Sequence, residues 1–260
     1  MRLRKLTWLL AFLVLEGCAA RLPGAPPGVL TPLADVLDQL RTRQTRVQSF
    51  QARGRIVLIA PERHYAGSGL LLGRDPATLR ADIYDPLGRS LLGFASDGRE
   101  VSVLSAQEAK FFRGPATPAN LAALVPPSVT LPQALKLLTA SVPLSPGPPA
   151  RQELDPSQGQ YLLEWQNPDG TPRERLWVDA RNLTPVKDDW FGSGGPHNFS
   201  VEWGDFGRLG PDLPGKVTLR TYQPLAELRL TYSELKVNPV LTAQELTLTP
   251  PAGVTVVPLP

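Results

Sequence analysis

Residues 51–113 alternate between apolar and polar side chains with a period of two, and turn residues interrupt the pattern every few positions. This pattern predicts short β-strands at residues 53–60, 65–72, 79–84, 90–95, 99–105 and 109–113. A parallel crossover needs about a dozen residues or more, so these short connections predict antiparallel neighbours. The dipeptide Asp97-Gly98 is the strongest hairpin signal in the chain. Glycines inside the strands predict a strongly curved sheet with bulges.

A second series of strands is predicted at residues 161–166, 173–179, 185–191, 198–203, 215–222, 226–235 and 246–249. Between the two series lie short apolar helices, one after Thr117-Pro118 and one after Thr130, where a capping residue precedes a run of Leu and Ala. The fold class predicted is mainly β with short helices (α+β). We expect a curved, incompletely closed antiparallel β-barrel of about a dozen strands with a helical lid.

A longer helix is predicted before the first strand. Thr31 is its expected N-cap and Pro32 its first residue, and apolar residues then recur at helical spacing up to Leu40. Arg41, Arg43 and Arg46 would lie on the other side. A helix of this kind can cover a sheet or rest on a membrane surface; the pattern favours the covering helix.

The N-terminus has the features of a bacterial lipoprotein leader. A basic start is followed by the apolar run Leu6 to Leu15 and by Cys18, the only cysteine of the chain. The stretch from Leu15 to Cys18 resembles a lipobox, although Glu16 departs from the usual small or apolar residue. We therefore expect a signal peptide at residues 1–17, acylation of Cys18, and a Pro/Gly-rich tether over residues 18–30. The folded domain is expected at 31–250 and a Pro-rich C-terminal tail at 251–260.

The charge balance does not indicate a nucleic-acid surface. The chain has 27 Lys and Arg against 24 Asp and Glu. Loss of Arg2, Arg4, Lys5 and Glu16 with the leader would leave 24 against 23, a net charge of +1. We expect no nucleic-acid partner and a monomer.

Residue patterns that carry catalysis are missing. His64 and His197 lie far apart in the sequence, and no metalloprotease, serine-hydrolase or phosphate-binding motif occurs. The acidic pairs Asp188-Asp189 and Glu202/Asp205 are interpreted as solvated faces or turn residues rather than as a metal or acid–base site. The expectation is a protein that is not an enzyme, with no cofactor and no metal.

The loop Asp85-Pro86-Leu87-Gly88 joins two of the predicted strands and contains an unusual residue. Pro86 and Gly88 suit a tight turn, whereas Leu87 is apolar at a position where polar residues are the norm. Leu87 either folds back onto the sheet or points outward toward an apolar partner. The sequence pattern alone does not separate these alternatives.

Several of these features resemble the LolA/LolB-fold lipoprotein family, which includes the outer-membrane lipoprotein receptor LolB. The resemblance rests on Gln51-Ala52-Arg53-Gly54 at the first strand, on Pro86-Leu87-Gly88, and on the apolar stretch from Leu131 to Leu144. The order of leader, helix, strands, helices and strands also agrees. The chain departs from the family pattern in a longer C-terminal half and in the Pro-rich stretch from Val142 to Ala150.

The resemblance implies an apolar cavity that receives the acyl chains of lipoproteins from a LolA-like periplasmic carrier. It also implies insertion of this cargo into the outer membrane by the loop Pro86, Leu87 and Gly88, from an anchor on the periplasmic face. Candidate cavity residues are Ile56, Leu58, Leu70, Leu72, Leu79, Ile83, Leu92 and Phe94; for each of them the alternative is ordinary packing in the core. The alternative function is that of an envelope structural or assembly lipoprotein that uses the same fold to bind a protein partner.

Overall fold

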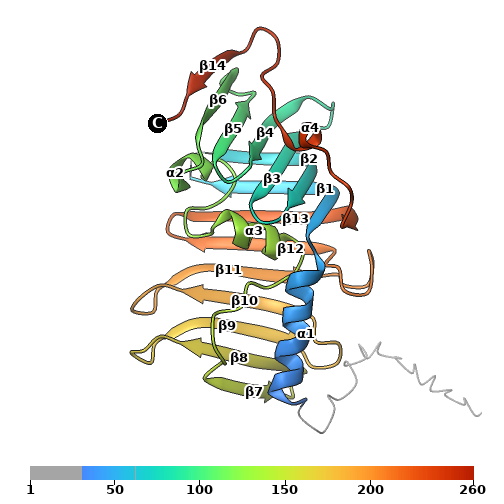
Figure 1. Ribbon diagram of the computed structural model, residues 1–260, viewed down its shortest axis with the longest axis vertical. Helices are drawn as coiled ribbons and strands as arrows, with labels where there is room; N and C mark the ends of the chain where they lie inside the picture. Colours follow the sequence, from blue (N-terminus) through green and yellow to red (C-terminus); the bar gives the residue numbers. More distant parts are fainter. Residues whose placement is uncertain (1–30, 62) are drawn as a thin grey trace, which may run out of the picture.

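The computed structural model describes residues 31–61 and 63–260, so the leader, Cys18 and the whole tether lie outside the described residues. All fourteen strands found in the described residues belong to one sheet with the order β14-β6-β5-β4-β3-β2-β1-β13-β12-β11-β10-β9-β8-β7 (Figure 1). The strands are β1 Ser49–Ala60, β2 Arg63–Arg74, β3 Thr78–Tyr84, β4 Ser90–Ser96, β5 Glu100–Ser105, β6 Lys110–Pro115, β7 Arg151–Asp155, β8 Gln160–Gln166, β9 Pro172–Asp179, β10 Pro185–Phe191, β11 His197–Gly204, β12 Lys216–Tyr222, β13 Leu225–Val237 and β14 Thr255–Pro258. The sheet does not close, because its two edges are β14 and β7. The expected open barrel with few, short helices is confirmed.

Two antiparallel meanders make up this sheet. Strands β1 to β6 form the first meander and β7 to β13 the second, and β1 joins them by pairing with β13. Strand β7, which the sequence pattern did not predict, forms the outer edge of the second meander. One pair is parallel: β14 runs alongside β6, so the all-antiparallel expectation needs a correction at this edge. The Pro-rich residues expected as a tail therefore contribute a strand to the sheet.

Glycines allow the sheet to curve sharply near the junction of the meanders. A Cβ atom at Gly67 would lie 1.9 Å from the carbonyl oxygen of Tyr84, and one at Gly54 would lie 2.2 Å from that of Thr231. A bulge between Arg53 and Gly54 shifts the register of β1 against β13. The backbones of neighbouring strands approach closely only where no side chain intervenes. The curvature predicted from these in-strand glycines is confirmed.

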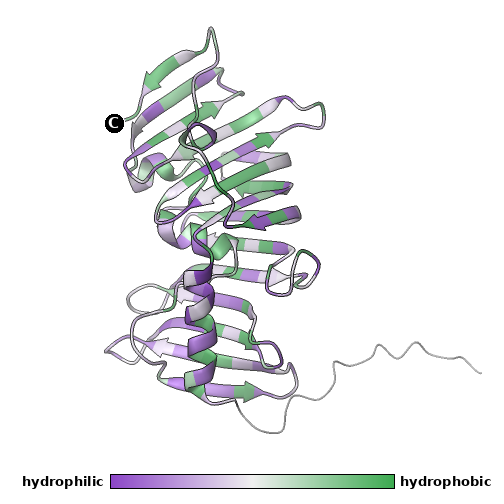
Figure 2. Cartoon of the chain, turned by 45° about the vertical axis from the view of Figure 1, so that its right-hand side comes forward, coloured by the Kyte–Doolittle hydropathy of each residue, from purple (hydrophilic) through white to green (hydrophobic). Residues whose placement is uncertain are grey.

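Helix α1, Leu33–Arg46, covers strands of the second meander and buries Val36, Leu37 and Leu40 (Figure 1). Two of its basic residues face the protein, because Arg43 and Arg46 each form an ion pair of 2.8 Å with Asp212. The helix is therefore a covering helix, as expected. In Figure 2 it shows alternating hydrophilic and hydrophobic stripes.

The start of α1 differs from the expected cap. Pro32 occupies the N-cap position, where no side-chain cap bond forms, and the helix begins at Leu33. The main-chain N–H of Thr31 instead donates to the Tyr161 hydroxyl at 2.8 Å. This tertiary bond between Thr31 and β8 replaces the local cap.

The short helices are α2 (Pro118–Leu121), α3 (Leu131–Leu138) and α4 (Ala243–Leu246). Thr117 and Thr130 cap α2 and α3 as predicted, and Thr130 forms a capping box with Gln133. Helix α4 was not predicted, and the strand expected at residues 246–249 is wrong, because Leu246 ends this helix and residues 247–249 form no strand. Among residues 31–61 and 63–260, no helix is both long and apolar enough to cross a membrane.

Candidate functional site

The inner face of the sheet, which α1 and α3 cover, carries the main apolar core. This core contains six of the eight candidate cavity residues: Ile56, Leu58, Leu79, Ile83, Leu92 and Phe94. Only two of the six line the small cavity beneath α3, namely Ile56 and Leu79, and Leu92 lines a separate pocket. Ile83 and Phe94 are completely buried in the packed core.

Leu70 and Leu72 lie on the opposite, outer face, which corrects their assignment as cavity residues. There Leu72 packs with Leu241 and Leu246, and Leu70 lies against this group. Leu71, between them, points inward and lines the small cavity. Because side chains alternate along a strand, a one-residue error in phase moves the whole set to the other face. Because Leu70, Leu71 and Leu72 are all apolar, the sequence does not show which of them point inward.

Helix α3 closes the inner face as a lid. Its residues Ala134, Leu137 and Leu138 pack toward Ile56 and Leu79 and leave a cavity of about 30 Å³. A water molecule occupies about this volume in the liquid, so the space is too small for an acyl chain. The structure thus has its lid closed over an almost filled core.

Hydrogen bonds from the sheet hold the C-terminal end of α3. The Trp203 indole N–H donates to the Leu137 carbonyl oxygen at 2.8 Å, and the Tyr232 hydroxyl donates to that of Leu138 at 2.9 Å. Burial raises the pKa of Tyr232, so its hydroxyl keeps the proton that it donates. These donors satisfy two of the carbonyl groups that a helix end leaves without intrahelical partners.

Lys136 ties the outer side of the same helix. Its ammonium group donates to the carbonyl oxygens of Gln44 and Val47 at 3.0 and 3.2 Å and forms an ion pair with Asp75. The lid is thereby attached both to the end of α1 and to the β2–β3 connection. Its C-terminal end is the fixed end, whereas Thr130 at its N-terminal end is exposed.

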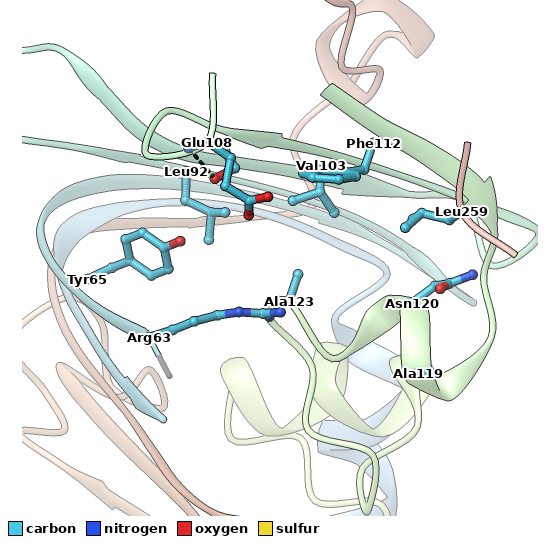
Figure 3. Close-up of a pocket in the computed structure, with 11 residues that line it drawn as sticks. Arg63, Tyr65, Leu92, Val103, Glu108, Phe112, Ala119, Asn120, Ala123 and Leu259 are labelled. Atoms are coloured by element: carbon cyan, nitrogen blue, oxygen red, sulfur yellow. Dashed lines mark hydrogen bonds between the residues drawn. The ribbon is translucent and has the colours of Figure 1, made fainter. Parts of the chain in front are cut away.

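A larger pocket of about 280 Å³ lies between the inner face of the first meander and α2 (Figure 3). Its wall includes the apolar side chains of Leu92, Val103, Phe112, Ala123 and Leu259 and the ring of Tyr65. Leu259 belongs to the C-terminal segment, whose N–H donates to the Arg113 carbonyl oxygen at 2.7 Å. The C-terminal residues thus complete the pocket.

Most residues that line this pocket were not predicted from the sequence. Tyr65 and Val103 are buried and share a face with Leu92 along the predicted strands, so period-two counting was sufficient to find them. Leu259 carries no such signal, because its position depends on the pairing of β14 with β6.

Two oppositely charged side chains, Arg63 and Glu108, also line the pocket and point toward it in Figure 3. Arg63 donates to the Ala122 carbonyl oxygen at 3.4 Å on the α2 side. The Glu108 main-chain N–H donates to the Ser105 hydroxyl at 3.2 Å. The pocket therefore combines an apolar wall with polar groups, an arrangement that suits an amphiphile.

The β3–β4 turn presents Leu87 to solvent. The Leu87 side chain is 79% exposed, which excludes the alternative that it folds back onto the sheet. The Asp85 carboxylate holds the turn by accepting hydrogen bonds from the N–H groups of Leu87 and Arg89 at 2.8 and 2.9 Å. Gly88 adopts a φ of 78°, as the turn requires. Pro86 and Gly88 are also exposed.

Hydrogen bonds to the charged form lower the pKa of Asp85, and the largest contribution comes from the Arg89 main-chain N–H. The Arg89 guanidinium also pairs with this carboxylate at 2.6 Å. The carboxylate is therefore ionised at neutral pH. It fixes the turn from within and leaves Leu87 without an intramolecular apolar contact to cover it.

The acidic pair Asp188-Asp189 is buried, which corrects its interpretation as a solvated face. Asp188 points into the core and accepts from the Trp190 indole N–H at 2.7 Å, whereas Asp189 pairs with Lys187 at 2.8 Å on the outer face. Burial, and then the nearby Glu174, raise the pKa of Asp188. The described residues contain no group of three or more His, Cys, Asp or Glu side chains able to hold a metal ion.

Glu174 anchors the Pro-rich segment that follows α3. Its carboxyl group accepts from the Ser145 N–H at 2.6 Å, and burial raises its pKa to about 7. The Trp165 indole N–H donates to the Gly147 carbonyl oxygen at 3.0 Å. Residues 145–147 are therefore bound to β8 and β9 as a loop of the same sheet.

No family model matches the chain, and no curated protein matches it in sequence. Its structure is similar to that of a LolA superfamily protein from Nitrosomonas europaea, with a TM-score of 0.54, 18% identity, and coverage of 84% of this chain and 98% of the other. The chain has a LolA-like fold.

A second similar structure is a DUF1329 family protein from Desulfovibrio piger, with a TM-score of 0.51, 11% identity, and coverage of 83% of this chain and 98% of the other. A domain described as a putative outer-membrane lipoprotein-sorting protein from Vibrio parahaemolyticus gives a TM-score of 0.49 at 11% identity, with coverage of 82% and 94%. At these identities the similarity concerns the fold.

Proposed function

We propose that this LolA-like protein binds acyl chains of lipoproteins on its inner face and helps to insert them into the outer membrane. The observation that carries the proposal is Leu87, 79% exposed at the tip of a turn fixed by the Asp85 carboxylate. A large apolar side chain held in this way is suited to enter an apolar phase. The pocket lined by Leu92, Val103 and Phe112 supplies a binding surface for acyl carbons on the same chain.

Binding and release follow from the hydrophobic effect alone. Each buried CH₂ group contributes about 0.8 kcal/mol, so part of an acyl chain in the pocket of about 280 Å³ gives useful affinity. Deeper insertion requires α3 to move away from Ile56 and Leu79, because the space beneath it is only about 30 Å³. Non-covalent binding of this kind needs no nucleotide, cofactor or catalytic group, and we propose that the protein is not an enzyme.

The proposed cycle has three partners. A LolA-like periplasmic carrier supplies the cargo, the acyl chains of the lipoprotein occupy the inner face, and the outer membrane receives them. Acylation of Cys18 would hold the protein at the periplasmic face of that membrane, with residues 18–30 as the tether. Leu87 then acts at the membrane surface.

The experiment follows a labelled triacylated lipoprotein from a loaded carrier to the full chain carrying Cys18→Ala, and then to vesicles. Leu87→Glu should accept the cargo normally and lose delivery to vesicles. Val240→Glu is the matched control, because Val240 is also an exposed apolar residue. The proposal fails if the wild-type chain takes no cargo from a competent carrier, or if Leu87→Glu delivers as well as Val240→Glu.

A second candidate function is that of an envelope assembly protein that binds a protein partner. The observation that favours it is the nearly filled space beneath α3. Under this alternative the chain would copurify with one stable partner, and labelled acyl chains would not bind to the inner face.

A further inference from the structure

A groove of about 1190 Å³ lies beside the loop that carries Leu87. Asp85, Pro86 and Gly88 of that loop form one part of its lining. Four cationic residues form another part of the lining, contributed by the first strand and by the β11–β12 region: Arg53, Arg55, Arg208 and Lys216. The most exposed part of the β3–β4 turn and a group of cations thus belong to one continuous surface.

Three glycines form part of the wall of this groove: Gly54, Gly67 and Gly69. No side chain fits at Gly54 or Gly67, because a Cβ atom there would collide with the main chain of the neighbouring strand. The strands that form this wall therefore approach each other closely.

The cations of the groove are only partly neutralised. Lys216 pairs with Asp205 at 2.9 Å, and Arg53 lies 3.7 Å from Glu234. Arg208 donates to the Tyr232 carbonyl oxygen, which carries no full charge. Arg55 is exposed and has no ion pair with any acidic residue in the part of the chain that the structure describes.

Neutral hydrogen-bonding groups surround the free guanidinium. Register places Arg55 opposite Ser68 on β2 and opposite Thr231 on β13, and Ser68 in turn opposite Tyr84 on β3. All three neighbours line the groove, and each offers a hydroxyl group. Guanidinium and hydroxyl groups together suit the oxygens of a phosphate.

We propose that this groove binds the phosphate headgroups of an anionic phospholipid bilayer while Leu87 enters the acyl region beside it. An exposed apolar side chain binds a membrane by entering its acyl region, and cations bind it by attraction to anionic headgroups. Where the two lie side by side, these contributions to the binding free energy add. Arg55 contributes the most, since no carboxylate competes for it among the described residues. The proposal adds lipid selectivity to the proposed membrane step.

The test measures cosedimentation of the mature chain, residues 18–260 with Cys18→Ala, with vesicles of phosphatidylcholine alone, or mixed with phosphatidylglycerol, at low and at physiological salt. Wild-type binding should rise with phosphatidylglycerol and fall with salt. Arg55→Gln should weaken binding to the mixed vesicles on the order of fivefold, as expected for loss of one cation near the surface. Binding to phosphatidylcholine alone should not change.

Arg99→Gln is the matched control, because Arg99 is an exposed arginine at the opposite end of β4 from Leu87. It should bind both kinds of vesicle like the wild type. The proposal is overturned if phosphatidylglycerol does not increase binding, or if Arg55→Gln and Arg99→Gln behave alike. It is also overturned if a soluble acidic peptide binds to the groove and anionic vesicles do not, since that result would indicate a protein partner.

These outcomes are separable from the proposed function, because transfer of cargo from a carrier is measured without vesicles. A chain that accepts lipoprotein but shows no preference for anionic vesicles refutes only the inference about the groove. A chain that binds anionic vesicles but accepts no lipoprotein refutes only the acyl-chain function.

Discussion

The indole N–H of Trp203 on β11 donates a 2.8 Å hydrogen bond to the carbonyl oxygen of Leu137 near the end of α3. The next carbonyl group, that of Leu138, accepts from the Tyr232 hydroxyl on β13. Both donors are buried. These two bonds attach one end of the lid to the sheet, so the lid can open only at its other end or after the bonds break.

Trp203→Phe should therefore destabilise the protein and loosen the lid. The Leu137 carbonyl group would keep the longer bond from the Ala140 N–H at 3.3 Å, and loss of the indole bond should cost about 1 kcal/mol. Urea unfolding should show this loss, and binding of a fluorescent fatty acid should increase because α3 is held less firmly. Trp177→Phe is the control: Trp177 lies on the outer face with Lys187 over its ring at 4.8 Å, so its effect should be small. Equal effects of the two substitutions would contradict the role of the hydrogen bond.

Gly67 and Gly69 should differ in their tolerance of a methyl group. A Cβ atom at Gly67 meets the main-chain oxygen of Tyr84 at 1.9 Å, whereas one at Gly69 meets the side-chain end of Ile56 at 2.1 Å. The Ile56 side chain can rotate, but the strand cannot move without breaking the sheet. Gly67→Ala should therefore lower the free energy of unfolding by about 1–3 kcal/mol more than Gly69→Ala does. Thermal unfolding of the two variants measures the difference, and the reverse order would refute this explanation of the curvature.

Glu174 should make stability depend on pH in the direction opposite to an ordinary carboxylate. Burial raises its pKa from 4.5 in the unfolded chain to about 7 in the folded one. Between these pH values the folded state keeps a proton that the unfolded state loses. The stabilisation that Glu174 contributes to the folded state is therefore complete below about pH 4.5 and is lost as the pH rises to about 7. The free energy of unfolding should fall by about 3 kcal/mol over this window and then level off.

Glu174→Gln isolates this effect, because the amide keeps the shape and does not titrate. The difference in unfolding free energy between wild type and variant should vary with pH over the same window, while carboxylates that do not interact with Glu174 cancel. The charged groups nearest to Glu174 are Asp188, whose pKa is also raised, and Arg173, whose charge favours the ionised form of Glu174. A difference independent of pH would show that Glu174 does not titrate in this range.

Local sequence signals predicted the elements whose causes are local. The caps Thr117 and Thr130, the Asp97-Gly98 hairpin and the alternating strands all depend on residues close together in the chain. The turn at Leu87 was recognisable for the same reason, although its exposure became evident only from the structure. The assignment of Leu70 and Leu72 to the inner face was wrong because three consecutive leucines fit either face.

Other features depend on contacts between distant segments. Strand β14 exists because residues 255–258 pair with β6, and Leu259 reaches the pocket through this pairing. The environment of Glu174 likewise depends on the Pro-rich loop, which is bonded to it through the Ser145 N–H. No local pattern encodes such contacts, and a pair of acidic residues in a strand is more often exposed.

The most direct test of acyl-chain binding is photo-cross-linking from a single ring position on each face of the sheet. The photoreactive amino acid benzoylphenylalanine would replace Phe112, which lines the inner pocket, or Phe191, which packs against His197 outside it. Each full chain would be exposed to a carrier loaded with a lipoprotein whose acyl chains are labelled. The account predicts cross-links to the acyl chains from position 112 and none from position 191. Equal labelling from both positions, or none from position 112 with the protein folded, would contradict it.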